Sequence, residues 1–267
     1  MVERAATPGS AYSQSLERGL AILSAFRSGR PLLGVSEIGR EIGLGRSTTH
    51  RYVATLATLG YLQQDVATKK YRLGPRVLDL GFSAINSMEL REVAAPHLRR
   101  LSDETGYTVN MAILDGLDIV YVERCRSTQA GQREIDLNLH VGARLPAYCT
   151  SLGKVLLAWL PAAAQAAALA RIDFARRGPN TLTSRAALTA ELKRVRADGF
   201  AINNEELAYG LRSIAAPVLD HAGEAVAGIN LAVHSSMVSM EELTAHLSET
   251  VRRAAAEISA HLGYRPA

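Results

Sequence analysis

The chain has 267 residues, of which 48% are hydrophobic and 21% are charged, close to an average globular composition. This length predicts two domains, and the lack of any apolar run of about 18 residues excludes a membrane-spanning helix. Two cysteines are too few for a disulfide framework, so we expect the reducing cytoplasm. Residues 1–11 lack the apolar stretch of a signal peptide and are predicted to be a disordered tail.

The net charge of +4 is unevenly distributed along the chain. Residues 12–76 contain ten Lys or Arg and four acidic residues, which gives +6 and leaves a net −2 for the rest. A small basic block before a larger, slightly acidic one is typical of an N-terminal nucleic-acid-binding module. Charge alone does not separate that function from an ordinary solvated surface.

The first part of the basic block predicts two short helices. Apolar residues recur at helical spacing from Leu16 to Phe26, and Ser15 is the expected N-cap. Ser36 is expected to cap a second helix, which Gly43 ends. A third helix follows over residues 46–59.

This third helix has two unlike faces. One face is expected to pack inward and consists of Thr49, Tyr52, Val53, Leu56 and Leu59. The opposite face is polar and basic near the N-terminus and carries small side chains further along. That layout suits the recognition helix of a helix-turn-helix, which enters the major groove of DNA.

Five residues at the front of this helix are candidate DNA contacts. Arg51 and His50 are the candidate base readers, because a guanidinium can bind guanine through two parallel hydrogen bonds. Arg46, Ser47 and Thr48 lie at the helix N-terminus, where hydroxyls, amides and the helix dipole suit phosphate.

A short hairpin follows the third helix. Residues 61–64 and 69–73 predict two strands around a turn, which is the wing of a winged helix-turn-helix. Lys69, Lys70 and Arg72 are expected to face the DNA backbone, although simple solvation is the alternative for each. The ordered combination of helices and hairpin predicts a winged helix-turn-helix domain over residues 12–74.

Residues 75–91 predict a linker helix that is apolar nearly all round. Such a helix needs two packing surfaces, and one of them can be a second copy of the chain. Dimerisation also suits a helix-turn-helix protein, which usually reads two half-sites. The alternative is an ordinary buried helix.

Residues 92–264 predict a larger α+β domain. A hairpin is expected around Asp115-Gly116, with further strands at 133–140, 200–206, 213–220 and 223–233. Helices are expected at 92–104, 151–160, 184–198 and 240–262. Helices around an antiparallel sheet make an α+β fold.

Seven segments in order resemble the IclR family of bacterial transcriptional regulators over residues 12–262. They are SLERGLAIL, RSTTHRYVATLATLGYL, KYRLG, VGARLP, TSLGKVLLA, YGLRSIAAPV and GEAVAGINLAV. The resemblance implies a winged-helix DNA-binding domain, a linker helix and a GAF-like effector-binding domain. It also implies homodimers that pair as dimers of dimers, and double-stranded promoter DNA as partner.

The segments LPAYCTSLGK and YGLRSIAAPV are similar to the branch of this family that controls aromatic-acid breakdown through the β-ketoadipate pathway. The resemblance therefore implies a sequence-specific regulator whose promoter binding responds to a small organic acid, such as protocatechuate, 4-hydroxybenzoate or a β-ketoadipate-type acid. Two alternatives stay open: a different catabolic operon with a non-aromatic acid, and an architectural DNA-binding protein without a ligand.

The resemblance implies an effector site at Gly142, Ala143, Asn203 and Ser213. The two glycine-turn amides would bind a carboxylate closely, since glycine allows close approach. Asn203 stands where the family often has Asp, which removes a negative charge from a site for an acid. Ser213 stands where many members have Cys, and it adds a hydroxyl donor.

Arg126 and Tyr148 are further effector candidates, as a carboxylate partner and a stacking ring respectively. Packing or a local hydrogen bond is the alternative for each candidate residue. Gly39 is a further departure, because the family prefers a helix former there; a glycine costs about 1 kcal/mol in a helix but permits closer packing.

One enzyme motif is present, because Ser151 and Lys154 match the S-x-x-K signature of acyl-enzymes. Its companion motifs S-D-N and K-T-G are absent, and we expect Ser151 to start a helix and Lys154 to be exposed. We therefore expect no enzyme. The His and Cys residues show no paired ligand spacing, so neither metal nor cofactor is expected.

Overall fold

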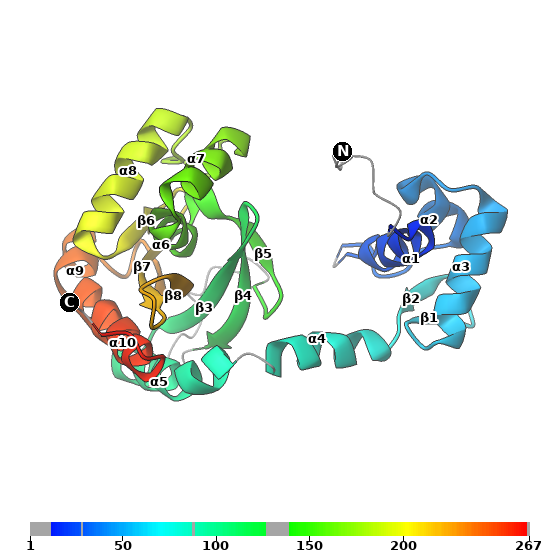
Figure 1. Ribbon diagram of the computed structural model, residues 1–267, viewed down its shortest axis with the longest axis horizontal. Coiled ribbons are helices and arrows are strands. Elements are labelled where there is room, and N and C mark those ends of the chain that lie inside the picture. Colours follow the sequence, from blue (N-terminus) through cyan, green and yellow to red (C-terminus); the bar gives the residue numbers. More distant parts are fainter. Residues whose placement is uncertain (1–11, 28, 87–88, 127–138, 266–267) are drawn as a thin grey trace. The chain divides into compact units, whose positions relative to one another are not determined.

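The computed structural model describes residues 12–265 except 28, 87–88 and 127–138 (Figure 1). The chain divides into two compact units, Met1–Ser87 and Met88–Ala267. The N-terminal unit has one cluster of buried apolar side chains and the C-terminal unit has two. Among the described helices, none is long and apolar enough to cross a membrane.

The N-terminal unit has the three helices and the hairpin that the sequence predicts. They are α1 (Gln14–Ser24), α2 (Val35–Ile42), α3 (Arg46–Thr58), β1 (Leu62–Gln64) and β2 (Tyr71–Leu73), followed by α4 (Arg76–Asn86). The core comprises Ile22, Ala25, Phe26, Leu33, Ile38, Val53, Leu62 and Tyr71. β1 pairs antiparallel with β2, so the winged helix-turn-helix is confirmed.

Both expected helix caps in this unit are wrong. Ser13, not Ser15, caps α1, and its hydroxyl accepts the backbone N–H three residues on at 3.3 Å. α2 begins directly after Gly34, whose N–H donates to the carboxylate of Glu37 at 2.7 Å. Each helix therefore starts before the residue that the apolar pattern indicates, because the capping bond closes the first turn earlier.

The inward face of α3 is largely as the sequence predicts. Thr49 and Val53 are fully buried, whereas Arg46, Ser47, His50 and the other front residues lie on the outer side. Leu59 is the exception, because the helix ends at Thr58 and the Leu59 side chain is 47% exposed.

Gly39 lies where α2 and α3 approach most closely. A Cβ atom at this position would be 2.8 Å from the carbonyl oxygen of Leu44 and 2.9 Å from Oγ1 of Thr49. Real Cβ atoms do not approach a backbone oxygen that closely. The departure from a helix former at Gly39 therefore permits close packing of α2 against α3.

The C-terminal unit is built on a six-stranded antiparallel sheet of order β5-β4-β3-β8-β7-β6. Its strands are β3 (Thr108–Asp115), β4 (Asp118–Cys125), β5 (Arg144–Pro146), β6 (Ala201–Asn204), β7 (Leu211–Leu219) and β8 (Ala225–His234). The hairpin around Asp115-Gly116 is confirmed. The strand expected at 133–140 falls mostly outside the described residues, and 139–140 are not part of a strand.

Helices cover both faces of this sheet (Figure 1). One face packs against α5 (Glu89–Thr105) and α10 (Ser248–His261). The other packs against α6 (Ser151–Trp159), and α8 (Arg185–Asp198) packs on α6. The remaining short elements are η1 (Ala147–Cys149), α7 (Ala162–Arg171), α9 (Met240–Glu242) and the π-helical η2 (Leu243–Leu247). This arrangement confirms the α+β fold.

We predict that Gly39→Ala destabilises the N-terminal unit although alanine is the better helix former. Helix propensity alone would favour the variant by about 1 kcal/mol, but the added methyl overlaps the carbonyl oxygen of Leu44. Gly19→Ala in α1 is the control, because nothing lies within 4 Å of its Cβ position. Calorimetry and amide hydrogen exchange of α2 and α3 measure the difference. Equal protection in both variants would mean that close packing at Gly39 is unimportant.

Candidate functional site

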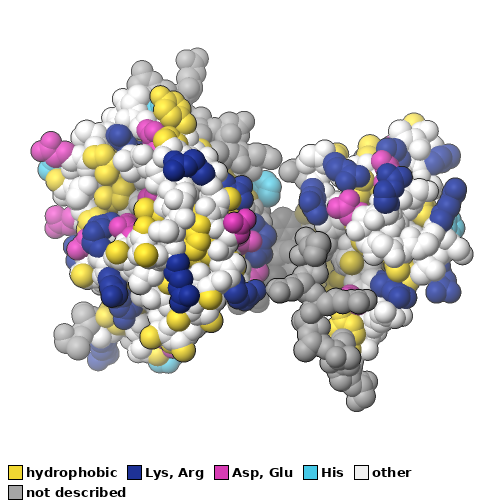
Figure 2. Space-filling view, turned by 90° about the horizontal axis from the view of Figure 1, so that it is seen from above, with side chains coloured by type: hydrophobic (Ala, Val, Ile, Leu, Met, Phe, Trp, Pro, Cys, Tyr) yellow, Lys and Arg dark blue, Asp and Glu magenta, His cyan; other side chains and the backbone are white. Residues whose placement is uncertain are grey.

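The front of α3 forms a continuous polar surface on the N-terminal unit. Arg46, Ser47, His50 and Arg51 are exposed, and Thr48 is half-buried. Within the described part of the chain, no hydrogen bond or ion pair occupies the guanidinium of Arg46 or Arg51. Both groups are thus available to an external anion. Figure 2 shows Lys and Arg side chains spread over the visible face of this unit, with few acidic ones between them.

The wing presents its three basic residues unequally. Lys69 lies exposed at the turn with a positive φ of 58°, and Arg72 is exposed while its Nε donates to Oε1 of Gln63 at 3.1 Å. Lys70 instead forms an ion pair with Glu37 of α2, at 3.2 Å from Nζ to Oε2. Lys70 therefore anchors the wing to the helices, and Lys69 is the freest cation of the three.

In the C-terminal unit, the sheet face covered by α6 carries a buried polar cluster, which comprises Asn110, Ser151, Asn203, Ser213 and Asn230. Asn203 and Ser213 are opposite each other on β6 and β7, so these two predicted residues are brought together. The hydroxyl of Ser151 at the start of α6 lies 2.7 Å from that of Ser213. The sequence interpretation did not place Asn110, Ser151 or Asn230 in this site.

The amide of Asn203 has a fixed orientation. Its Oδ1 accepts the backbone N–H of Glu206 at 2.9 Å. Because a backbone N–H can only donate, the oxygen must face the loop, and Nδ2 is left as a donor on the other side. Asn203 therefore offers an N–H group where an aspartate would offer a carboxylate oxygen.

The other predicted effector residues are placed less favourably. The N–H of Gly142 donates to the carbonyl of Tyr121 at 2.7 Å, and that of Ala143 donates to His140 at 2.9 Å. In this conformation neither amide is free for a carboxylate, contrary to expectation. Arg126 lies exposed just beyond the end of β4.

Tyr148 has a packing role in this structure. It is 4% exposed, its hydroxyl donates to the carbonyl of Ala175 at 2.5 Å, and its ring makes an edge contact with Phe174. Burial raises the pKa of the Tyr148 hydroxyl. The surroundings of Tyr148 favour the packing alternative over stacking on a ligand.

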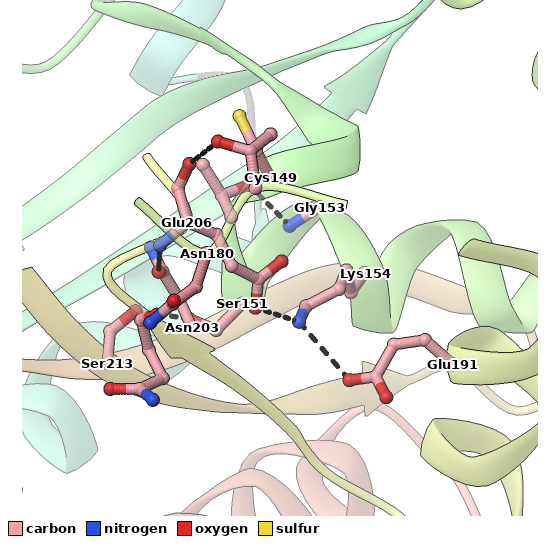
Figure 3. A network of polar contacts seen from close by, with 12 residues as sticks. Cys149, Ser151, Gly153, Lys154, Asn180, Glu191, Asn203, Glu206 and Ser213 are labelled. Carbon is pink, nitrogen blue, oxygen red and sulfur yellow. Dashed lines mark hydrogen bonds and ion pairs between the residues drawn. The ribbon is translucent and has the colours of Figure 1, made fainter. Parts of the chain in front are cut away.

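Lys154 is buried, so the expectation that it is exposed is wrong. Its Nζ donates to Glu206 at 2.5 Å and to Glu191 at 3.2 Å, and Figure 3 shows it between the two carboxylates. Burial raises the pKa of Glu206, although Lys154 opposes this effect. Burial also tends to raise the pKa of Glu191, but hydrogen bonds and charges from Arg194 and Lys154 hold that pKa below its usual value.

The loop that contains Glu206 is held from a second side by residues 178–181. Oγ1 of Thr181 donates to the carbonyl of Glu206 at 2.6 Å, and Nδ2 of Asn180 donates to the carbonyl of Asn204 at 3.0 Å. A Cβ at Gly178 would lie 2.2 Å from the carbonyl oxygen of Glu205, so only glycine fits there. The backbone that orients Asn203 is therefore rigidly supported.

The S-x-x-K motif does not have the geometry of an acyl-enzyme. Ser151 bonds to Ser213, and the ammonium of Lys154 is engaged by carboxylates, so it is not positioned as a base for Ser151. Among the residues that the structure describes, no group of three or more His, Cys, Asp or Glu is arranged to hold a metal ion.

We predict that Lys154→Met lowers the free energy of unfolding by about 3–5 kcal/mol, because it leaves two carboxylates without their buried cation. The double variant Lys154→Met/Glu206→Gln recovers a large part of the loss. Arg194→Met is the control: its ion pair with Glu191 is half exposed and contributes about 0–1 kcal/mol. Urea unfolding measures all three, and a loss in Lys154→Met no larger than in Arg194→Met would contradict the assignment.

The pH dependence gives a second measure of the same ion pair. The pKa of Glu206 in the folded protein is raised above its ordinary value of 4.5. Between these two pKa values, folding therefore favours the protonated carboxyl group. Removing Lys154 strengthens that preference. The deficit of Lys154→Met is therefore expected to shrink as the pH falls through the raised pKa of Glu206, where the buried charge disappears.

Comparisons with known proteins match both units. Residues 15–66 match the IclR helix-turn-helix domain, and residues 82–260 match the bacterial transcriptional regulator IclR C-terminal domain. The chain is 38% identical over 232 residues to the Pca regulon regulatory protein of Pseudomonas putida, covering 87% of this chain and 78% of the relative. It is 36% identical over 251 residues to the HTH-type transcriptional regulator XynR of Escherichia coli (strain K12), covering 94% and 98%.

A similar solved structure contains a ligand. It is an IclR homolog complexed with 4-hydroxybenzoate from Microbacterium hydrocarbonoxydans, with a TM-score of 0.80 and 26% sequence identity. The similarity covers 93% of this chain and 99% of that one.

Proposed function

The chain belongs to the IclR family of bacterial transcriptional regulators, and from that premise we propose which residues read promoter DNA and which bind the effector. It is a DNA-binding regulator whose promoter binding is modulated by a small organic acid. The buried polar cluster under α6 is the observation that carries the effector assignment. We assign the effector to the aromatic acids or the β-ketoadipate-type acids.

We assign DNA reading to the exposed front of α3. Arg51 and His50 contact base edges in the major groove, and Arg46, Ser47 and Thr48 contact phosphates at the helix N-terminus. The free guanidinium groups and the small outer side chains further along α3 support this assignment. Lys69 and Arg72 of the wing add contacts to the DNA backbone, while Lys70 holds the wing in place.

We assign the effector to the buried polar cluster. Nδ2 of Asn203 and one hydroxyl of the Ser151–Ser213 pair, whose other O–H joins the two serines, are uncharged donors that suit a carboxylate or a phenol oxygen. Asn203 places no negative charge against the acid. The relative from Pseudomonas putida is named for the Pca regulon, and the similar solved structure holds 4-hydroxybenzoate, which supports an aromatic-acid class.

We propose that the protein acts as a homodimer and as a dimer of dimers. Leu16 and Leu20 on α1 are 63% and 55% exposed, and Leu78 and Leu80 on α4 are 60% and 56% exposed. A second copy of the chain would cover these leucines and supply the second reading head for a palindromic site. A regulator of this kind works in the cytoplasm, where its DNA is, and the contacts of Ser151 and Lys154 favour a non-enzymatic role.

We predict that Arg51→Ala weakens operator binding by about 1–3 kcal/mol and relaxes sequence preference at one base position. Arg46→Ala is expected to weaken binding to operator and unrelated DNA alike, because a phosphate contact carries no sequence information. Arg185→Ala on the C-terminal unit is the control, since this exposed residue is far along the chain from the reading helix. Footprinting and gel shifts measure the effects, and unchanged preference in Arg51→Ala would refute its role.

We predict that the protein binds an aromatic acid and that the acid changes its gel shift on the upstream promoter region. Calorimetry with 4-hydroxybenzoate, protocatechuate and β-ketoadipate measures binding, and Ser213→Ala is expected to weaken it about tenfold, since it removes a hydrogen bond to a charged group. Ser236→Ala is the matched control, because Ser236 is exposed and bonds only to His234 in the described structure. No heat with any of the three acids would contradict the effector class.

A further inference from the structure

A chain of hydrogen bonds crosses three neighbouring strands of the C-terminal sheet. Nη1 of Arg124 on β4 donates to Oδ1 of Asn110 on β3 at 2.8 Å. Nδ2 of Asn110 then donates to Oδ1 of Asn230 on β8, also at 2.8 Å. Asn110 is fully buried and Asn230 is 4% exposed, so the two amides do not exchange partners with water.

The direction of this chain is fixed by its first member. A guanidinium has only donors, so Asn110 must face Arg124 with its oxygen and Asn230 with its nitrogen. Asn230 therefore receives the bond on its oxygen, and its Nδ2 is the last donor of the chain. Within the described residues, no acceptor for this Nδ2 is present.

Asn230 lies on the sheet face that α6 covers. Gly228, two residues earlier on β8, faces α6, because a Cβ there would be 3.1 Å from Val155 and 3.2 Å from Leu152. Asn230 is opposite Ala215, and Ser213 precedes Ala215 by two positions on the same face of β7. The last donor of the chain thus belongs to the buried polar cluster that contains Ser213.

Two independent hydrogen bonds therefore fix the side-chain amides of Asn203 and Asn230 in the same orientation, with the nitrogen toward the cluster. The backbone N–H of Glu206 turns the oxygen of Asn203 away from the cluster, and Asn110 occupies the oxygen of Asn230. Each asparagine is left with its nitrogen as the available group. A buried site with donors fixed in this way selects a ligand rich in acceptors.

We propose that Arg124, Asn110 and Asn230 form a relay that makes the effector site select a carboxylate over the corresponding amide. In this relay Asn230 contacts the effector, whereas Arg124 and Asn110 are positioning residues that set the orientation of its amide. The relay rests on the proposed function, because it acts on the acid assigned to the buried polar cluster.

Asn110→Asp reverses the last step of the relay with almost no change in shape. An aspartate accepts from both neighbours, so Arg124 keeps its bond while Asn230 must turn and donate its own N–H. The oxygen of Asn230 then faces the ligand. The affinity for 4-hydroxybenzoate is expected to fall at least tenfold, and the affinity for 4-hydroxybenzamide is expected to stay within threefold or rise.

Asn204→Asp is the matched control. It makes the same chemical change on β6, and the oxygen of Asn204 already accepts from Nε of Arg212 at 2.9 Å, so the new carboxylate is paired. Affinity for the acid is expected to stay within twofold. Equal effects of the two substitutions, or equal losses for acid and amide in Asn110→Asp, would overturn the relay.

Arg124 supplies a second test that does not depend on Asn110→Asp folding. Arg124→Lys keeps a donor at the start of the relay and is expected to retain most of the preference for acid over amide, whereas Arg124→Met is expected to lose it. Equal acid-to-amide ratios in these two variants would count against the relay. If the wild-type protein binds neither probe but does bind its promoter, the effector class itself is wrong, which is a different failure.

Discussion

The buried ion pair between Lys154 and Glu206 is the contact on which the proposed effector site depends. Lys154 belongs to α6, whose first residue, Ser151, supplies a hydroxyl to the buried polar cluster, and Glu206 belongs to the loop whose backbone orients Asn203. The pair therefore joins the helix and the strand ends between which a ligand is proposed to lie (Figure 3). Burying such a pair has a large desolvation cost, and removing only one of its two partners destabilises the protein even more. A ligand in this site therefore binds to a framework whose rearrangement would cost a large amount of free energy.

The spacing of apolar residues and the turn residues predict much of the fold. The two faces of α3, the hairpin at Asp115-Gly116 and the capped helix from Ser184 to Asp198 follow from local spacing, and each is confirmed. Helix starts were harder to predict, because a cap depends on one hydrogen bond: Ser13 and Ser15 are chemically identical candidates. The prediction that Leu59 packs inward is wrong, because the apolar spacing continues to Leu59 but α3 ends at Thr58.

The candidate site was only half visible in the sequence. Asn203 and Ser213 were found through resemblance, but the bond between Asn110 and Asn230 joins residues 120 positions apart, and only the strand register brings them together. Lys154 carried an overlooked signal. A single lysine among SLGKVLLAWL leaves no polar stripe to expose it, so a buried partner was the physically consistent expectation. The identity of its partners, Glu191 on α8 and Glu206 in the loop after β6, depends on tertiary packing that local patterns do not predict.

The wing anchor between Lys70 and Glu37 has a consequence for how DNA binding responds to ionic strength. Added salt displaces the protein from phosphates by reducing the gain from counterion release, and it also screens this exposed ion pair. Screening weakens one of the contacts that hold the wing, so part of the salt sensitivity is expected to come from the protein itself. The number of phosphate contacts derived from the slope of affinity against salt concentration is then larger than the number of phosphates that the side chains contact.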